Sequence, residues 1–510
     1  MNRLRDPAMD GAACSRLPLV PAVQGQRLRR DLDRAGGAGR EEQLQYRMRN
    51  AAWRPGRTVS GLRRQMRSSM SNEQRDGLYL VLMGSLVFIL MGTVLQRAVP
   101  APLADFGTIY FPSKALIEQR DPFKPGEVTR IYEAQRDSRA PETPKDRQIA
   151  TQNVYPPNTL FLAVPFAALP LKPAGILWSI VTLACFITAS LLVWNLGADY
   201  APALSGALVG FLLAASELLP MTGNVAGIAI GLCAIAVWCF VRERLVALGI
   251  LCLAVSLVLK PHDTGLVWLY FLLAGSIQRK RALKTLLVAL VLSLPGLLWV
   301  WRVAPQWIHE WGVNLAAYSA RGGVNDPGLH SSGGHGLDSL VSLQTIFSVI
   351  KDDPRFYNAA AELVCTPLLL ALIYLALRRR SSPARTWMAL AAVAALTMLP
   401  IYHRQLDAAL LLLAVPGCAL LWSRKGIAGR IGLAVTAAAL VFTGAFGWMI
   451  VEGLLTVMHP PATGWGAWLA MAVQVFPAPL ILLATGCFYL WALARGGREP
   501  APDAQAAALE

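Results

Sequence analysis

Long apolar runs recur along most of the chain and are separated by short polar connections. A helix that crosses a bilayer needs roughly 17 to 25 mostly apolar residues, and the runs meet this length repeatedly. The pattern predicts an all-α, polytopic membrane fold with about twelve transmembrane helices. The predicted spans are 77–96, 174–195, 202–219, 224–241, 245–259, 263–277, 283–301, 361–378, 386–400, 405–422, 430–451 and 466–493. Three are short (245–259, 263–277 and 386–400), which is typical of half-helices or of helices tilted into a cavity.

Two long connections interrupt this pattern. The first, near residues 97–173, ends in the apolar stretch 159–170, which is too short to cross and is expected to lie in the membrane interface. The second, near 302–360, contains a run rich in Gly, Ser and His at 328–336, a composition typical of a mobile lid.

Basic residues in the short connections indicate the orientation. With a cytoplasmic N-terminus, all of them lie on the same side, so both termini are expected inside a bacterial inner membrane. These residues are Arg242, Arg244, Arg279, Lys280, Arg281, Arg378, Arg379, Arg380, Arg424 and Lys425. This orientation places all six histidines outside or at the outer membrane edge, so we expect an extracytoplasmic active face. They are His262, His309, His330, His335, His403 and His459.

Composition agrees with a membrane protein. The chain is 55% hydrophobic and 15% charged, with a mean hydropathy of +0.45, which excludes a water-soluble fold. Half of the net charge of +16 comes from residues 1–76, which contain 16 arginines and 8 acidic residues. We interpret this segment as a disordered cytoplasmic tail, with Met66 or Met70 as alternative translation starts, and not as a nucleic-acid-binding region. Residues 77–495 form the predicted membrane domain and 496–510 a cytoplasmic tail.

Cysteines and histidines give no metal signal in the sequence. Seven cysteines lie in apolar segments and Cys14 lies in the tail, so neither a disulfide nor a thiolate metal site is expected. His330 and His335 have no cysteine or carboxylate at metal-binding spacing. No metal ligand is therefore predicted.

Asp105 is the first candidate for chemistry. It follows the first span in the stretch Asp105–Tyr110, among aromatic residues that exclude water. Such surroundings raise the pKa of a carboxylate toward the range of a general base. The alternative is an ordinary solvated loop aspartate.

The strongest physical signal is the sequence Lys260–Asp263, which interrupts a hydrophobic run. Ionisable groups at membrane depth are costly unless they face a cavity or a partner. Lys260 offers a compact cation for a phosphate, and His262 lies beside it. The alternative is an exposed hairpin tip whose lysine snorkels to the interface.

A second polar cluster, Tyr402–Asp407, opens the tenth span. Arg404 is suited to holding a phosphate through two parallel hydrogen bonds, and His403 to donating to it or carrying a proton. An ion pair between Arg404 and Asp407 is the structural alternative.

Two turns supply further candidate site residues. Tyr155 precedes two prolines, which fix the backbone, and Asn224 is either a helix N-cap or a sugar ligand.

Taken in order, these pieces resemble the polyprenol-phosphate-mannose-dependent mannosyltransferases of glycosyltransferase family 87, in the GT-C superfamily. The resemblance covers most of the chain from about residue 77. It depends on Asp105–Phe106, Tyr155–Pro157, Gly223–Asn224, Lys260–His262 and Tyr402–Asp407. The family commonly has Gln at the position of Asn224, and the first loop here is long, with a charged insert at 124–150.

The resemblance implies a membrane glycosyltransferase that moves a hexose, expected to be mannose, from a polyprenyl-phosphate donor to a lipid-linked or envelope glycan acceptor. Asp105 is the expected base of an inverting single displacement. Lys260, His262, His403, Arg404, Asn224, Tyr155 and Tyr110 are the expected donor-binding residues. No cofactor is expected, although a divalent cation is compatible with some relatives of the superfamily. A lipid-glycan flippase or polymerase and a secondary transporter are the alternative functions.

Overall fold

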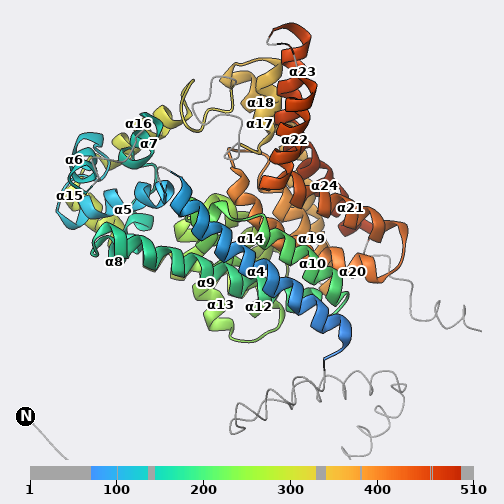
Figure 1. Cartoon of the computed structure of the whole chain (residues 1–510). Helices are drawn as coiled ribbons and strands as arrows, with labels where there is room; N and C mark the ends of the chain where they lie inside the picture. The colour runs from blue at the N-terminus through green and yellow to red at the C-terminus, as the bar shows by residue number, and fades with distance from the viewer. Residues whose placement is uncertain are drawn as a thin grey trace, which may run out of the picture. The chain divides into compact units, whose positions relative to one another are not determined.

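The computed structural model describes residues 70–99, 102–135, 144–328, 340–378, 382–459, 461 and 463–495. The C-terminal tail, most of the N-terminal tail, Cys14, His330 and His335 lie outside these residues. Within them the chain is helical, with one isolated antiparallel β-bridge between Leu340 and Arg404 and no longer strand. The prediction of an all-α fold is confirmed (Figure 1).

The helices are numbered as in Figure 1. They are α4 (Asn72–Ala98), α5 (Ala104–Ile117), α6 (Pro125–Gln135), α7 (Pro144–Thr151), α8 (Pro157–Ala167), α9 (Leu171–Gly197), α10 (Pro202–Ala214), α11 (Leu218–Thr222), α12 (Ala226–Val241), α13 (Val246–Leu259), α14 (Pro261–Leu273), α15 (Ser276–Val303), α16 (Trp307–Ser319), α17 (Leu343–Ile350), α18 (Pro354–Arg378), α19 (Pro383–Leu396), the 3-10 helix η1 (Gln405–Ala414), α20 (Val415–Ser423), α21 (Ile427–Phe442), α22 (Ala445–Met458), α23 (Gly464–Val475) and α24 (Pro477–Arg495).

Seven segments of the described chain are long and apolar enough to cross a membrane, which confirms a polytopic membrane protein. They are α4, α9, α10 with α11, α15, α18, η1 with α20, and α24. The pair α21 and α22 makes an eighth if a bent pair counts as one span. Helices α8, α12, α13 and α19 are apolar but shorter. The expected number of twelve therefore stays a prediction.

Two predicted spans are interrupted in the structure. The continuous run 430–451 is two helices, α21 and α22, bent by 72° at a short break. Gly444 lies in this break with extended backbone and packs against Ala215. The run 466–493 is likewise divided into α23 and α24, and α24 begins at Pro477, whose missing N–H suits the first turn of a helix. Hydropathy alone does not detect either break, because both runs stay apolar throughout.

The first span begins earlier than predicted, at Asn72. Ser71 caps it, because its hydroxyl accepts from the Gln74 backbone N–H at 3.2 Å and the Gln74 side chain accepts from the Ser71 N–H at 3.0 Å. Further along, α4 packs closely on α10 through glycines. A Cβ atom at Gly84 would lie 2.3 Å from the Gly210 carbonyl oxygen, and one at Gly210 would lie 2.5 Å from the Leu80 carbonyl oxygen. Small residues allow this close approach of two membrane helices.

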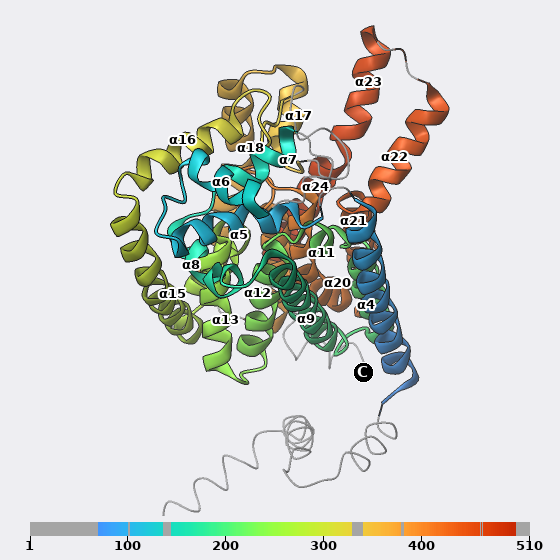
Figure 2. The same ribbon diagram turned by 60° about the vertical axis from the view of Figure 1, so that its left-hand side comes forward.

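Segments from the two long connections pack together. Figure 2 shows α5, α6, α7 and α16 gathered at one end of the helix bundle. Trp311 of α16 donates to the Val154 carbonyl at 2.9 Å. Asn314, one turn further on, donates to the carbonyls of Phe123 and Asn153 at 2.9 and 3.0 Å. The two connections, treated separately in the sequence, therefore form a single cap. The short apolar stretch at its base is α8, which begins at Pro157 after an extended Pro156.

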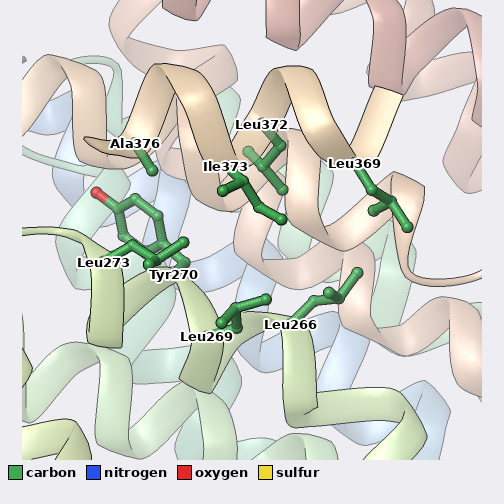
Figure 3. Close-up of a pocket in the computed structure, with 8 residues that line it drawn as sticks. All are labelled: Leu266, Leu269, Tyr270, Leu273, Leu369, Leu372, Ile373 and Ala376. Atoms are coloured by element: carbon green, nitrogen blue, oxygen red, sulfur yellow. The ribbon is translucent and has the colours of Figure 1, made fainter. Parts of the chain in front are cut away.

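Helix α14 packs against α18 through aliphatic side chains (Figure 3). The lining residues are Leu266, Leu269, Tyr270, Leu273, Leu369, Leu372, Ile373 and Ala376. The space between them is about 20 Å³, which is room for one water molecule, and its walls are almost entirely apolar. This contact is therefore packing and not a ligand site. Its effect is to fix α14, whose first turn carries the polar residues described next.

Candidate active site

The polar cluster begins at the break between α13 and α14. Helix α13 ends at Leu259 and α14 begins at Pro261, so Lys260 takes a non-helical conformation (φ −151°, ψ 78°) between them. Proline fits the first helical position because its fixed φ is already helical and it has no N–H to satisfy. Lys260 is 6% exposed and Asp263 is fully buried. The alternative of an exposed hairpin tip with a snorkelling lysine is wrong.

Two aspartates neutralise Lys260. Its ammonium forms an ion pair with Asp407 and lies 3.2 Å from Oδ2 of Asp263. Asp407 also accepts from the backbone N–H of Arg404 at 2.9 Å, so it caps the start of η1. Buried charges are tolerated only when they are paired, so these contacts anchor the loop before η1 to the α13–α14 break.

The Arg404 side chain contacts the second long connection. Its guanidinium donates to the Val324 carbonyl at 2.9 Å and to Oδ1 of Asn325 at 3.1 Å. Residue Asp326 organises the same loop, because its carboxylate accepts from the N–H groups of Gly322 and Gly328, both at 2.8 Å. Arg404 thus contacts the part of the second connection that precedes residues 329–339.

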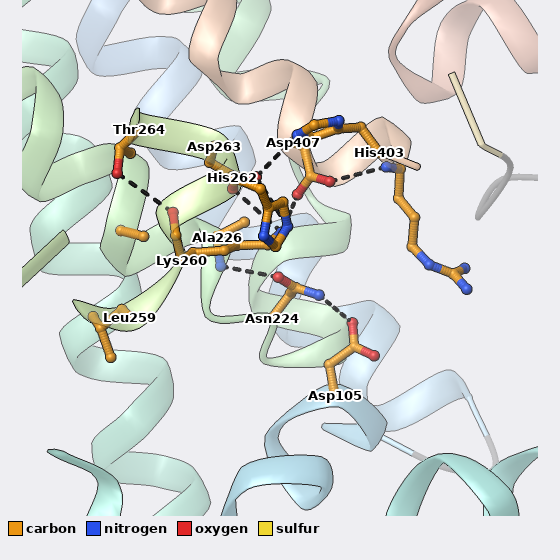
Figure 4. A network of polar contacts seen from close by, with 12 residues as sticks. Asp105, Asn224, Ala226, Leu259, Lys260, His262, Asp263, Thr264, His403 and Asp407 are labelled. Atoms are coloured by element: carbon orange, nitrogen blue, oxygen red, sulfur yellow. Dashed lines mark hydrogen bonds and ion pairs between the residues drawn. The ribbon is translucent and has the colours of Figure 1, made fainter. Parts of the chain in front are cut away.

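Two histidines approach the buried carboxylate of Asp263. The Nε2 atoms of His262 and His403 lie 3.4 and 3.5 Å from Oδ1 of Asp263 (Figure 4). Nδ1 of His403 lies 3.2 Å from the Ile401 carbonyl oxygen, and the His403 carbonyl accepts from the Val341 N–H at 2.8 Å. His403 is fully buried.

Asp105 is held by Asn224. The Asn224 side-chain amide donates to Oδ2 of Asp105 at 2.8 Å, and its carbonyl oxygen accepts from the Ala226 N–H at 2.9 Å. Asn224 therefore bonds to the first residue of α12, although the N-cap position itself is Val225, and it also orients the candidate base. Figure 4 shows this pair beside the Lys260 cluster.

Buried tyrosines connect the charged groups. Burial raises the pKa of the Tyr155 phenol, while Lys260 lowers it and Asp105 raises it. Burial also raises the pKa of Tyr318, with Asp105 adding to the increase and Arg404 opposing it. The Tyr155 phenol therefore lies close enough to Lys260 and Asp105 to respond to their charges, and the Tyr318 phenol responds in the same way to Asp105 and Arg404.

Two further tyrosines differ in their surroundings. Tyr402 lies near the charged groups, whereas the Tyr110 hydroxyl bonds elsewhere. Burial raises the pKa of Tyr402, with Lys260 opposing. The Tyr110 hydroxyl lies 2.9 Å from both the Leu169 carbonyl oxygen and Oε1 of Gln135, and its ring packs 5.4 Å from that of Phe106. These contacts make Tyr110 a packing residue of α5.

The structure adds residues that were not assigned to the site from the sequence: Asp263, Asp407, Tyr318 and Tyr402. The sequence does indicate Asp263, because it follows Lys260 by three residues and side chains at this spacing meet on a helix. Tyr318 has none, because it lies in α16 of the second long connection. Only the packing of the cap brings it to Asp105.

These features define a polytopic membrane protein with a buried, charged site where helix breaks and the cap meet. Residues 153–400, just under half of the chain, match the model of glycosyltransferase family 87. This match and the membrane-length helices indicate a membrane glycosyltransferase. A search of characterised proteins found no significant match.

The matched segment contains Tyr155, Asn224 and Lys260 but ends before the sequence around His403, and Asp105 precedes it. The structure brings both outlying parts against the matched segment through the Asp105–Asn224 and Asp407–Lys260 contacts.

Proposed function

We propose that the chain transfers a hexosyl group, mannosyl in the first instance, from a polyprenyl-phosphate sugar to a lipid-linked or envelope glycan acceptor. The acceptor oxygen attacks the anomeric carbon as the bond from that carbon to the phosphate oxygen breaks, which inverts the configuration. The acceptor proton passes to Asp105, and polyprenyl phosphate leaves with the bonding electron pair. The site faces the extracytoplasmic side of a bacterial inner membrane.

The observation that carries this proposal is the Asp105–Asn224 hydrogen bond at 2.8 Å, in a region bordered by Lys260 and Arg404. A general base needs a fixed orientation toward the hydroxyl, and the Asn224 amide holds Oδ2 of Asp105 in place. The cations Lys260 and Arg404 suit a departing phosphate.

An apolar groove next to Lys260 supports a lipid donor. It has a volume of about 400 Å³ between α8, α13, α14 and α15, and its lining includes Val258 and Pro261 on either side of the α13–α14 break. The lining also includes Trp268, Leu290 and Ser293. An isoprenoid chain in this groove would bring its phosphate toward Lys260 from within the membrane.

A direct transfer assay tests the proposal. The full chain in lipid nanodiscs is given radiolabelled polyprenyl-phosphate mannose and a membrane lipid extract, and label in new glycolipid is measured. Wild type is compared with Asp105→Asn and with Asp199→Asn, whose carboxylate pairs with Arg242 elsewhere in the chain. Loss of a positioned base lowers the rate by about 10²- to 10⁴-fold, so Asp105→Asn is expected to lose transfer and Asp199→Asn to keep it.

Each outcome bears on a different part of the proposal. Equal transfer by wild type and Asp105→Asn removes Asp105 from the mechanism. Absence of transfer by wild type from polyprenyl-phosphate mannose, and from the corresponding glucose and galactose donors, overturns the proposed donor class.

A further inference from the structure

We propose that His262, Asp263 and His403 bind a divalent transition-metal ion, with zinc as the best match. One imidazole nitrogen of each histidine and one oxygen of Asp263 would be the protein ligands. The fourth position would face the region between Lys260 and Asp105. Ion binding stands on the geometry alone, and the role of the ion toward a phosphate depends on the proposed function.

The distances between these ligand atoms agree with a coordination sphere. Oδ1 of Asp263 lies 3.4 Å from Nε2 of His262 and 3.5 Å from Nε2 of His403, and one ligand atom from each residue lies within 4.8 Å of the others. Ligands about 2.1 Å from a tetrahedral zinc ion are about 3.4 Å apart. A charge-assisted hydrogen bond between imidazolium and carboxylate is shorter, about 2.7 to 2.9 Å, so the spacing favours a metal over a shared proton.

The proposed ligand atoms make no hydrogen bond among the described residues. Nε2 of His262, Oδ1 of Asp263 and Nε2 of His403 are buried and have no hydrogen-bond partner there, while Oδ2 of Asp263 pairs with Lys260. Nδ1 of His403 faces the Ile401 carbonyl, which only accepts, so this nitrogen carries the proton and Nε2 presents its lone pair. Metal-bound histidines use their second nitrogen in the same way.

The charge of the cluster supports a cation. With neutral imidazoles, one ammonium (Lys260) faces two carboxylates (Asp263 and Asp407), which leaves a formal charge of −1. This charge would repel a phosphate. A divalent ion changes it to +1, and the ion itself would polarise a phosphate oxygen as a Lewis acid.

The ligand set selects the kind of ion. Two imidazoles and one carboxylate with an open position are typical of zinc and related transition metals, whereas magnesium and calcium prefer oxygen ligands. Cobalt(II) replaces zinc in such sites and gives a visible absorption spectrum, so it reports the geometry directly.

The test measures metal binding without reference to transfer. The full chain is purified in nanodiscs with a tag that contains no histidine, stripped with a chelator, and loaded with zinc or cobalt(II). Wild type, His262→Gln and the exposed control His309→Gln are compared by metal content and by cobalt absorption. Wild type and His309→Gln are expected to bind about one ion, with the intense bands of a four-coordinate site, and His262→Gln to bind at least about 10- to 100-fold more weakly.

Two results would overturn the inference: no stoichiometric ion in wild type, or an unchanged cobalt spectrum in His262→Gln. The Asp105→Asn variant separates this inference from the proposed function, because it should bind cobalt(II) as wild type does whether or not it transfers sugar. Transfer by a wild-type protein that binds no metal would reject the ion and leave the glycosyltransferase proposal intact.

Discussion

The side-chain amide of Asn224 donates to Oδ2 of Asp105 at 2.8 Å, across 119 positions of sequence. This bond joins the first turn of α5 to the residue two positions before α12, and its acceptor is the proposed base. Both ends of the Asn224 amide form hydrogen bonds, since its nitrogen donates to Asp105 and its oxygen accepts from the Ala226 N–H. An amide is therefore required here, with its nitrogen toward Asp105.

Substitution of Asn224 is expected to lower both activity and stability. A hydrogen bond to a charged group contributes about 1.5 to 3 kcal/mol, so Asn224→Ala should slow transfer about 10- to 100-fold. Loss of its bond to the Ala226 N–H should cost about 0.5 to 2 kcal/mol in unfolding free energy. Asn224→Asp should be slower still, because two carboxylates would then face each other. The transfer assay and thermal unfolding measure both effects.

The control for this prediction is Asn195→Ala, whose side chain bonds to Trp238 and Arg242 instead. It should transfer label at the wild-type rate. If Asn224→Asp is as active as wild type, the contact with Asp105 has no part in the chemistry.

Removing Lys260 is expected to destabilise the protein. Lys260→Met would leave Asp263 and Asp407 buried without their cation, which costs about 3 to 5 kcal/mol. The double variant Lys260→Met/Asp407→Asn should recover part of this loss, because one of the uncompensated charges is gone. Thermal unfolding in detergent measures both, with Lys172→Met at an exposed position as the control. Equal unfolding temperatures for Lys260→Met and Lys172→Met would contradict a buried ion pair at Lys260.

The glycine contact between α4 and α10 predicts a steric effect at Gly210. A Cβ atom there would lie 2.5 Å from the Leu80 carbonyl oxygen, so the backbones must separate. Gly210→Ala is expected to cost about 1 to 3 kcal/mol. Gly453→Ala is the matched control, because a Cβ atom at Gly453 meets nothing within 4 Å. Equal unfolding temperatures for the two variants would show that α4 and α10 are not closely packed.

The cap should respond to pH through Glu310. Burial raises the pKa of Glu310 above its ordinary value of 4.5, the hydrogen bond and charge of Asp121 add to this, and Lys124 opposes it. Because folding raises this pKa, the folded state holds the proton more tightly than the unfolded chain. The contribution of Glu310 to stability is therefore full below pH 4.5 and declines as the pH rises past that value.

Thermal unfolding from about pH 4 to about pH 8 measures this decline. Glu310→Gln is expected to remove this component, so its unfolding temperature relative to wild type should rise with pH. Lys124→Met should make the decline steeper, since it removes the cation that favours the ionised carboxylate. A difference between Glu310→Gln and wild type that does not change with pH would contradict the assignment.

Apolar length, helix breakers and the membrane class were accessible from the sequence, because these properties are local. A bilayer requires long apolar helices, and Pro261 must end one helix and begin another wherever the chain goes. Because hydropathy is also a local property, it did not predict the break between α21 and α22. The bend between α21 and α22 lies inside a long apolar run, where no charged residue indicates it.

The tertiary structure alone decided which of the candidate groups meet. Asp105, Asn224 and Lys260 are individually visible in the sequence, but their arrangement depends on the packing of α5, α12 and the α13–α14 break. Tyr318 reaches the same region only because α16 packs on the first long connection. The sequence by itself thus determined the helices and the residues with useful chemistry. Long-range packing decided the site, because the Asp105–Asn224 and Lys260–Asp407 contacts join residues more than one hundred positions apart and no local pattern encodes them.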